Sequence, residues 1–425
     1  MDEILPLRAQ AELRNRWLAE RLESVLPGLM RREKIDMWIV DAREYAEDPV
    51  IMTLLPRPTM SAGRRLILIF SLKSDGRVER LAISRYGAGA LYRSAWDTSA
   101  EDQDACLARI VAERGPQRIG LNYSSTFAHA DGLTHTLHQR LAAALGPALV
   151  SRFVSAERLA VGWLERRTAD EISAYGPITR IGHRIIAEAF SASVVRPGST
   201  TVEELEWWIR QAIHDRGLTA WFQPTVDIQA ADLTFAAVTA TRDGAHPNTR
   251  NLILPGDLIH CDMGFYYLGL AVDQQQNAYV LRPGESSAPA GLSELLHQAN
   301  RLQDIVAQQM VAGRTGNEIL QAALAAAHDA GLPAAIYTHP LGYHGHAAGP
   351  TIGLWDNQAY VPGAGDYELH DDTCYAIELN VTAAIPEWRE SGSGGVRMAV
   401  EEDAAFSGGK LDWLSGRQES IICIG

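Results

Sequence analysis

The sequence has few cysteines, no long apolar run and no excess of positive charge, and each absence excludes a class of protein. Its four cysteines, Cys106, Cys261, Cys374 and Cys423, form neither a CxxC pair nor the spacing of a disulfide framework. Reduced thiols in a cytoplasmic protein are therefore expected. No hydrophobic stretch approaches the roughly 20 residues that cross a bilayer, and the first residues lack the basic and then apolar order of a signal peptide.

The formal net charge of −14 argues against nucleic acid and anionic membranes as partners, because both bind basic surfaces. It places no restriction on a small substrate. The 425 residues exceed what one hydrophobic core normally organises, so the sequence predicts two domains.

The first 160 residues alternate between helical and strand patterns. Helical patterns cover three stretches, 1–34, 101–114 and 131–145. Four β-rich runs are found at 35–41, 66–70, 78–84 and 118–122. This alternation predicts an α/β domain over residues 1–160. Because it contains no metal-ligand cluster and no nucleotide-binding motif, its expected role is support, a lid or a dimer contact.

An internal repeat marks the second domain, which we place at residues 161–425. The capping-box spacing of Thr168 and Glu171 predicts the start of its first helix. Residues 198–205 read Gly-Ser-Thr-Thr-Val-Glu-Glu-Leu, and residues 313–320 read Gly-Arg-Thr-Gly-Asn-Glu-Ile-Leu. Each copy lies between helical patterns and precedes a strand-rich segment. Two such halves predict a duplicated α+β domain, with one shared antiparallel sheet, helices on one side and a cleft between the halves.

The strand-rich segments contain five side chains suited to hard metal ions, namely Asp262, Asp273, His339, Glu378 and Glu401. Eleven residues of extended chain would separate the two aspartates by about 36 Å. A hairpin at 265–269 would instead bring them side by side. Adjacent buried carboxylates repel each other unless a cation or a proton lies between them, so the pair favours a metal site.

The other three candidates lie in equally suggestive surroundings. Glu378 interrupts an apolar β run, and Glu401 stands where a hydrophobic strand turns acidic, although a buried charge is costly unless it is paired or coordinated. His339 begins a histidine- and glycine-rich segment whose backbone can approach a ligand closely. Four carboxylates and one imidazole suit manganese, cobalt, iron or zinc, and their number fits two ions that share bridging carboxylates.

The order of these motifs resembles the pita-bread metallopeptidase family, which includes creatinase, prolidase, aminopeptidase P and methionine aminopeptidase. A second histidine, His346, follows His339 by seven positions, as in the prolidase form. The resemblance covers nearly the whole chain. It implies a creatinase-type α/β N-terminal domain, followed by an α+β pita-bread catalytic domain with pseudo-twofold duplication and a curved antiparallel sheet.

The same resemblance implies a role for each candidate ligand. Asp262 would chelate one ion, His339 and Glu378 would bind the other, and Asp273 and Glu401 would bridge the two. A hydroxide bridging the ions would attack the scissile carbonyl. Glu378 would also carry the proton to the leaving nitrogen.

Two further histidines would contact the substrate, His346 beside the scissile carbonyl and His246 in the cleft. The roles of His344 and Arg397 stay open. Two extra residues separate Arg397 from Glu401 relative to the family pattern, which makes Glu402 a competing choice for the last ligand.

The resemblance implies a metallopeptidase that hydrolyses Xaa-Pro bonds in dipeptides or short peptides. It further implies two divalent ions per chain, with manganese first and cobalt, zinc or iron as alternatives, and a homodimer. The family usually places a threonine and an arginine where this chain has Gln274-Gln-Gln, and Pro-Gly where it has Leu379-Asn380. These departures concern substrate choice more than metal binding.

Two alternatives remain at this stage. A metal-dependent C–N hydrolase or lyase for a small molecule, similar to creatinase, ectoine hydrolase or a sulfonium lyase, would use the same scaffold. An inactive binding module is less favoured, because all five candidate ligands are present.

Overall fold

The computed structural model describes residues 4–231, 250–388 and 395–425. The chain divides into two compact units, Leu5–Glu171 and Ile172–Gly425. The first unit extends past residue 160 because α7 (Glu157–Glu165) packs against α2 (Leu26–Arg32) and α3 (Pro49–Leu54). Thr168 and Glu171 exchange the two hydrogen bonds of the predicted capping box at the start of α8 (Ala169–Ala189).

The first unit is built on a six-stranded mixed sheet in the order β4-β3-β2-β1-β5-β6. Its strands are β1 (Met37–Arg43), β2 (Arg65–Leu72), β3 (Val78–Ile83), β4 (Arg93–Ser94), β5 (Ile119–Leu121) and β6 (Phe153–Ser155). Its other helices are α1 (Leu7–Ser24), α2 (Leu26–Arg32), α3 (Pro49–Leu54), α4 (Gln103–Arg114), η1 (Ala128–Ala130), α5 (His135–Leu145) and α6 (Pro147–Val150). Apolar side chains of β1, β2 and β3 form one core with those of α4 and α5. The predicted α/β architecture is confirmed.

The second unit contains a ten-stranded sheet, antiparallel except where β16 joins β10. Along the sheet the order is β11-β13-β14-β10-β9-β7, and β12, β15, β16 and β8 pair with β13, β14, β10 and β9 respectively. The strands are β7 (Thr219–Ala220), β8 (Thr225–Gln229), β9 (Leu258–Tyr267), β10 (Leu270–Val280), β11 (Ala334–Ile336), β12 (His339–Leu341), β13 (Thr373–Ala383), β14 (Val396–Ser407), β15 (Lys410–Trp413) and β16 (Ile422–Ile424). The helices are α8 (Ala169–Ala189), α9 (Val202–Asp215), α11 (Ala290–Gln309), α12 (Gly316–Asp329) and the short η3 (Ala364–Asp366).

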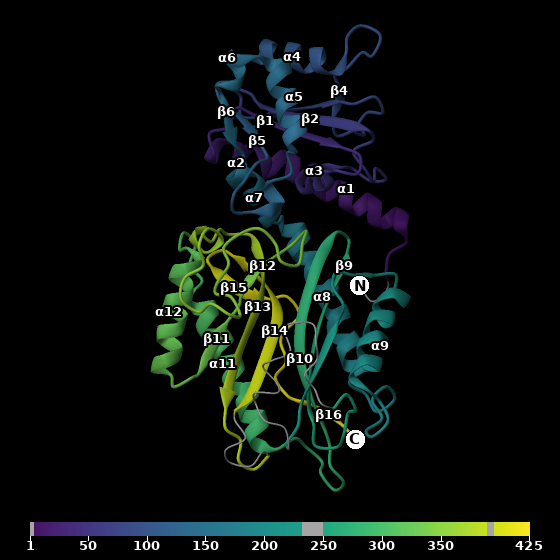
Figure 1. Ribbon diagram of the computed structural model, residues 1–425, viewed down its shortest axis with the longest axis vertical. Coiled ribbons are helices and arrows are strands. Elements are labelled where there is room, and N and C mark those ends of the chain that lie inside the picture. Colours follow the sequence, from purple (N-terminus) through teal and green to yellow (C-terminus); the bar gives the residue numbers. More distant parts are fainter. Residues whose placement is uncertain (1–3, 232–249, 389–394) are drawn as a thin grey trace. The chain divides into compact units, whose positions relative to one another are not determined.

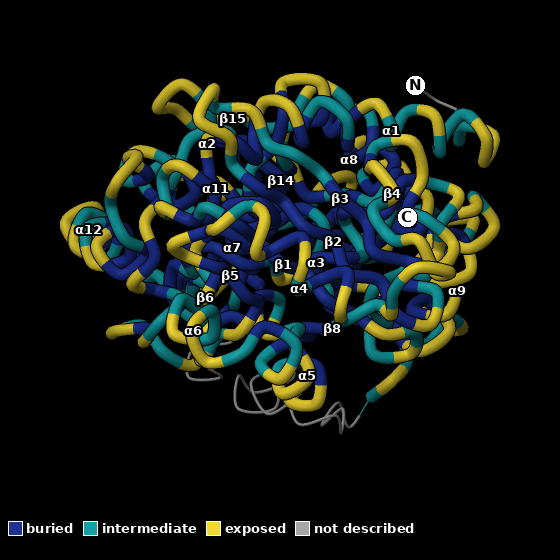
Figure 2. Tube along the Cα trace, turned by 90° about the horizontal axis from the view of Figure 1, so that it is seen from above, coloured by how far each residue is buried: buried dark blue, intermediate teal, exposed yellow. Residues whose placement is uncertain are grey.

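Helices α8 and α11 pack against one face of this sheet and leave the other face for polar side chains. Gly182 of α8 lies against Gln274 of β10, and Gln303 of α11 donates to the backbone of Ile377 on β13. Figure 1 shows α8 and α9 beside β9 and β10, and α11 and α12 beside β11 and β13. In Figure 2 strands such as β2 and β14 are largely buried, whereas α12 exposes its outer side. Among the described residues, no helix combines the length and apolar composition needed to cross a membrane.

The two halves of the second unit repeat one plan, which confirms the predicted duplication. Gly198 donates to Ile253 O at 2.7 Å, and Gly313 donates to Leu369 O at 2.9 Å. A candidate ligand follows each acceptor by nine residues. It is Asp262 on β9 in the first half and Glu378 on β13 in the second.

Each half also begins a helix with a capping box. The partners are Thr201 with Glu204 in the first half and Thr315 with Glu318 in the second. The first box lies one residue later than the alignment of the two copies predicts. The consecutive Thr-Thr and Glu-Glu pairs allow two capping boxes with the same spacing. In the observed one, Leu205 of α9 is buried.

Candidate metal centre

A tight hairpin joins β9 to β10 and sets the position of both candidate aspartates. Leu268 and Gly269 occupy its turn with φ of 56° and 81°, as a two-residue type I′ turn requires. The register places Asp262 opposite Gln275 and Asp273 opposite Gly264. Because alternate residues of a strand share a face, the two carboxylates lie diagonally on the same side. The predicted hairpin is confirmed, with its turn at 268–269.

Neighbouring strands continue this polar row across the sheet. Gln275 pairs with Glu401 of β14, and Glu401 pairs with Glu378 of β13. Asp262, Gln275, Glu401 and Glu378 thus succeed one another on four adjacent strands. His339 of β12 pairs with Ala376, two residues from Glu378, and so reaches the same face.

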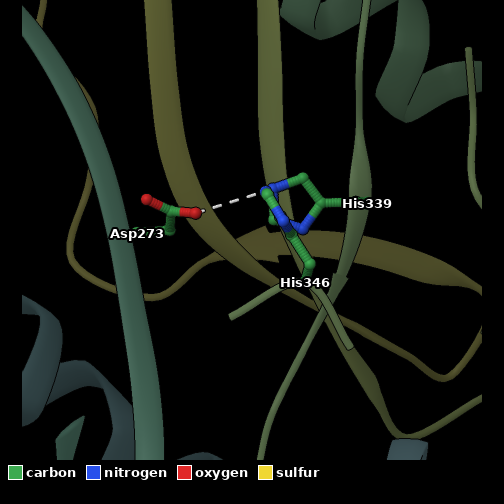
Figure 3. A group of neighbouring side chains, drawn as sticks. All are labelled: Asp273, His339 and His346. Atoms are coloured by element: carbon green, nitrogen blue, oxygen red, sulfur yellow. Dashed lines mark ion pairs between the residues drawn. The ribbon is translucent and has the colours of Figure 1, made fainter. Parts of the chain in front are cut away.

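The five sequence-predicted ligands converge within this region. Within each of three groups, the candidate ligand atoms lie within 4.8 Å of one another. The groups are Asp262 with Asp273 and Glu401, His339 with Glu378 and Glu401, and Asp273 with His339 and His346. Figure 3 shows the third group, in which His339 Nε2 lies 3.6 Å from Asp273 Oδ2.

Burial makes this concentration of negative charge costly. Asp273, His339, Glu378 and Glu401 are all buried. Burial, followed by the nearby carboxylates of Glu401, Asp262 and Glu378, raises the pKa of Asp273 well above its usual value. Burial lowers the pKa of His339, but Glu401, whose Oε1 lies 3.3 Å from Nε2, and Glu378 outweigh it and raise that pKa overall. A cation at this position would relieve the repulsion.

The donor atoms fit a divalent metal ion. Asp273 Oδ1 is buried and has no hydrogen-bond partner among the described residues, and the buried atoms His339 Nε2 and Glu401 Oε1 face each other at 3.3 Å. Natural proteins rarely leave such atoms unsatisfied. A set of carboxylate oxygens and one imidazole nitrogen, with no sulfur, suits manganese, cobalt, iron or zinc.

A cavity of about 290 Å³ opens above the carboxylates. Half of its lining residues carry rings, namely Trp221, Phe222, Tyr337, Trp355 and His346, and the other half are polar, namely Asp262, Asp273, Gln275, Glu378 and Glu401. The exposed His346 ring lies 4.7 Å from the His339 ring and 5.2 Å from that of Trp221. His346 therefore stands between the buried ligands and the open side of the cavity, where it can meet a substrate or a metal ion.

Strand alternation separates Glu401 from Glu402. Glu401 faces the cavity, whereas Glu402 turns to the opposite face and lies 2.6 Å from His183 Nε2. Glu402 also accepts a hydrogen bond from the Gln276 amide at 3.1 Å. The geometry therefore favours Glu401 as the metal-facing residue.

The remaining sequence candidates are placed less directly. Arg397 is on β14, four residues before Glu401, with its backbone hydrogen-bonded in both directions to the Gln229 side chain. His344 is half-buried, and its carbonyl accepts a hydrogen bond from the backbone N–H of Gly342. His246 lies outside the described residues.

Sequence reasoning missed several residues of the site. Gln275 donates to both Glu378 and Glu401, and Asp403 accepts the backbone N–H of Asp273 at 3.3 Å. Burial, together with Glu401 and Glu402, raises the pKa of Asp403 well above its usual value. Both residues follow a predicted ligand by two positions in a strand, which is a signal that the sequence does contain. The aromatic walls come from loops and give no comparable signal.

Comparisons with known proteins give one family match and a set of similar structures. The sequence model of metallopeptidase family M24 matches residues 178–402. The X-Pro aminopeptidase of Thermotoga maritima MSB8 is similar in structure, with a TM-score of 0.64, 18% identity, and coverage of 93% of this chain and 99% of that one. The Xaa-Pro dipeptidase of Bacillus anthracis gives a TM-score of 0.62 at 17% identity, with coverage of 97% and 99%.

Zn-substituted aminopeptidase P of E. coli, in complex with product, gives a TM-score of 0.57 at 13% identity, with coverage of 97% and 96%. None of the curated protein sequences compared with the chain matches it. At these identities the solved structures establish the fold, and the family match covers most of the duplicated domain.

Proposed function

The chain belongs to metallopeptidase family M24, and from this we propose that it hydrolyses Xaa-Pro bonds in dipeptides or short peptides. Two kinds of support favour this substrate. The similar structures include an X-Pro aminopeptidase and an Xaa-Pro dipeptidase. The cavity above the acidic cluster has aromatic walls that suit a small apolar ring such as that of proline.

The convergence of the five predicted ligands is the observation that carries the proposal. We assign Asp262 to one divalent ion, and His339 and Glu378 to a second. Glu401 belongs to a candidate ligand group on each side, which supports its assignment, together with Asp273, as a bridge. Such ions, when bound, supply a Lewis acid and lower the pKa of water.

The chain's own residues would then carry out the proton transfers and orient the substrate. Glu378 lines the cavity, so its carboxylate can take a proton from the attacking water and return it to the leaving nitrogen. His346, exposed at the cavity wall, can donate a hydrogen bond to the scissile carbonyl oxygen. The rings of Trp221 and Trp355 would limit the access of water. We propose the same substrate-contacting role for His246 as for His346.

Several further assignments belong to the same proposal. The oxygen-rich donor set supports manganese as the working metal, with cobalt, zinc or iron able to replace it. The four free cysteines support a cytoplasmic location. We assign the first unit, for which the sequence predicts residues 1–160, to support, a lid or a dimer contact, and the second unit, for which it predicts residues 161–425, to catalysis. A homodimer is proposed from the family resemblance alone, and light scattering of the purified protein tests it.

A substrate panel tests the proposed activity. The protein, loaded with Mn²⁺ after chelation, is assayed against Xaa-Pro dipeptides, longer Xaa-Pro peptides and small cyclic amidines. Cleavage of the proline peptides is expected, together with close to two ions per chain. If the metal-loaded protein cleaves none of the proline peptides, the peptidase assignment is wrong. Turnover of small C–N substrates in that case would identify the alternative, a small-molecule enzyme on the same scaffold.

A further inference from the structure

We propose that Gln275 is a positioning residue that holds the Glu378 and Glu401 carboxylates in the arrangement two metal ions require, and that His260 fixes the orientation of its amide. This inference rests on the proposed metal site. Gln275 stands where the family pattern has a different residue, so its role belongs to this chain and is not carried over from the resemblance.

The Gln275 amide nitrogen contacts both carboxylates. Its Nε2 donates to Glu378 Oε1 at 2.9 Å and to Glu401 Oε2 at 2.8 Å. An amide nitrogen carries two protons, so these two bonds use its full donor capacity. Gln275 is buried, with 2% of its surface exposed. It therefore acts on the two carboxylates and has no donor left for a substrate.

In Glu401 the bond from Gln275 selects one carboxylate oxygen and leaves the other for an ion. In Glu401, Oε2 is held by Gln275, whereas Oε1 is buried and lies 3.3 Å from His339 Nε2. The Gln275 amide and its two hydrogen bonds, called the clamp below, thus direct Glu401 Oε1 toward the side of the site where His339 and Asp273 lie.

His260 holds the amide oxygen of Gln275 from the side away from the two carboxylates. Its Nε2 lies 2.9 Å from Gln275 Oε1, and an amide oxygen only accepts, so in this orientation Nε2 carries a proton and donates it. His260 Nδ1 faces Asp227 Oδ2 at 3.7 Å from the adjacent strand β8. With the amide reversed, its oxygen would face two carboxylates, and its nitrogen would need His260 in the other tautomer. Only the observed orientation satisfies all three partners of Gln275.

The position of the clamp explains why it matters. Glu378 and Glu401 are direct cross-strand neighbours, and like charges in that relationship repel each other. Two donors placed between them offset this repulsion before any ion arrives. Without the donors, the carboxylates would turn apart or take up a proton, and metal binding would have to reverse that change. Groups that orient metal ligands typically alter metal affinity 10- to 100-fold.

The neighbouring glutamine provides a matched control. Gln276 is also buried, is on the same strand and donates to a carboxylate, that of Glu402 at 3.1 Å, but on the opposite face of the sheet. Mn²⁺ affinity is measured by isothermal titration calorimetry on the full chain after chelation. Gln275→Leu is expected to weaken binding about 10- to 100-fold, whereas Gln276→Leu should leave it within about twofold of the original protein.

A second variant keeps the proposal testable if leucine prevents folding. Gln275→Asn retains the amide but is one methylene shorter, so it cannot reach both carboxylates. It is expected to weaken Mn²⁺ binding and to change the visible absorption of the Co²⁺-loaded protein, because the ligand oxygens move. His260→Leu should act in the same direction by releasing the amide.

The outcomes separate this inference from the proposed function. If the unaltered chain binds no Mn²⁺, Co²⁺ or Zn²⁺, the metal site itself is wrong. If it binds two ions, and the Gln275 variants bind them equally well with an unchanged Co²⁺ spectrum, the clamp is wrong and the proposed function stands.

Discussion

Glu378 and Glu401 face each other directly across β13 and β14, and both carboxylates are buried. Asp273 lies on the same face of the sheet, where burial and Glu401 raise its pKa. Without a cation, repulsion between these buried carboxylates destabilises the folded state. A bound cation removes most of that repulsion. Stability and metal binding should therefore be coupled in this protein.

Addition of Mn²⁺ to the chelated protein should raise its thermal stability. At a free concentration of 100 times Kd, mass action adds about 2.7 kcal/mol for one site. Differential scanning fluorimetry over a series of Mn²⁺ concentrations measures the effect. A melting temperature that is the same with and without Mn²⁺, Co²⁺ or Zn²⁺ would contradict the proposed site.

Two adjacent glutamates should behave in opposite ways. Glu401→Gln is expected to reduce metal content and to lower turnover at least about 100-fold, since a proposed bridging ligand is lost. Glu402→Gln should retain both ions, because Glu402 contacts His183 and Gln276 on the other face. Elemental analysis of the two purified variants distinguishes them. Loss of metal from the Glu402 variant alone would reverse the assignment.

Local patterns in the sequence predicted the parts of this site that depend on one segment at a time. The hairpin that carries Asp262 and Asp273 follows from two β-rich runs around a short turn. The acidic Glu378 within an apolar run identified a buried charge before any geometry was known. The two similar stretches at 198–205 and 313–320 predicted the duplication, and in each half a Thr and a Glu three residues apart begin a helix.

Pairing between distant strands decided what the sequence left open. Glu401 and Glu402 are equivalent by composition, and only the register of β14 against β13 and β10 turns Glu401 to the cavity. The same register brings Gln275 between two carboxylates more than 100 residues away in the chain. Loops supply Trp221 and Trp355, and loop conformation has no periodicity from which their positions could be predicted.

Trp221 should lose its place in the cavity wall if Gly345 gains a side chain. A Cβ at Gly345 would lie 2.3 Å from the Trp221 ring, and one at Gly264 would lie 2.0 Å from its Nε1, so both glycines leave room for the indole. Gly345→Ala is expected to raise KM about tenfold, roughly the effect of losing one apolar wall contact. Steady-state kinetics measure it, with Gly28→Ala, which meets no atom within 4 Å, as the control. An unchanged KM would show that Trp221 does not contact the substrate.

Stability of the first unit should fall as pH rises from about 4 to about 6 through the contribution of Asp48. Burial raises the pKa of Asp48 to about 6 against the opposing hydrogen bonds from Asn122 and Val50, compared with an ordinary value of 3.8. Between these two values the folded state binds more protons than the unfolded state, so the free energy of unfolding decreases with pH. The full change is about 3 kcal/mol for a shift of about two units.

Urea denaturation of the intact chain and of Asp48→Ser across this pH range isolates the contribution. Serine keeps an acceptor for the backbone N–H of Val50 at the start of α3, so the cap is retained. The difference in unfolding free energy between the two proteins should fall from about pH 4, continue to fall through pH 6 and level off about one pH unit higher. A difference independent of pH would show that Asp48 ionises as freely in the folded state as in the unfolded one.

Asp273 and His346 should separate metal binding from catalysis. Asp273 is buried among the candidate ligands, so Asp273→Ala is expected to abolish activity and to reduce the metal content. His346 is exposed at the cavity wall, and removal of a donor to the developing oxyanion typically lowers kcat about 100- to 1,000-fold. His346→Ala should therefore retain both ions while turnover falls by about that factor. Because His346 also forms a candidate ligand group with Asp273 and His339, metal analysis is decisive: a His346→Ala protein that has lost an ion would make this histidine a ligand, and the scissile carbonyl would need another donor.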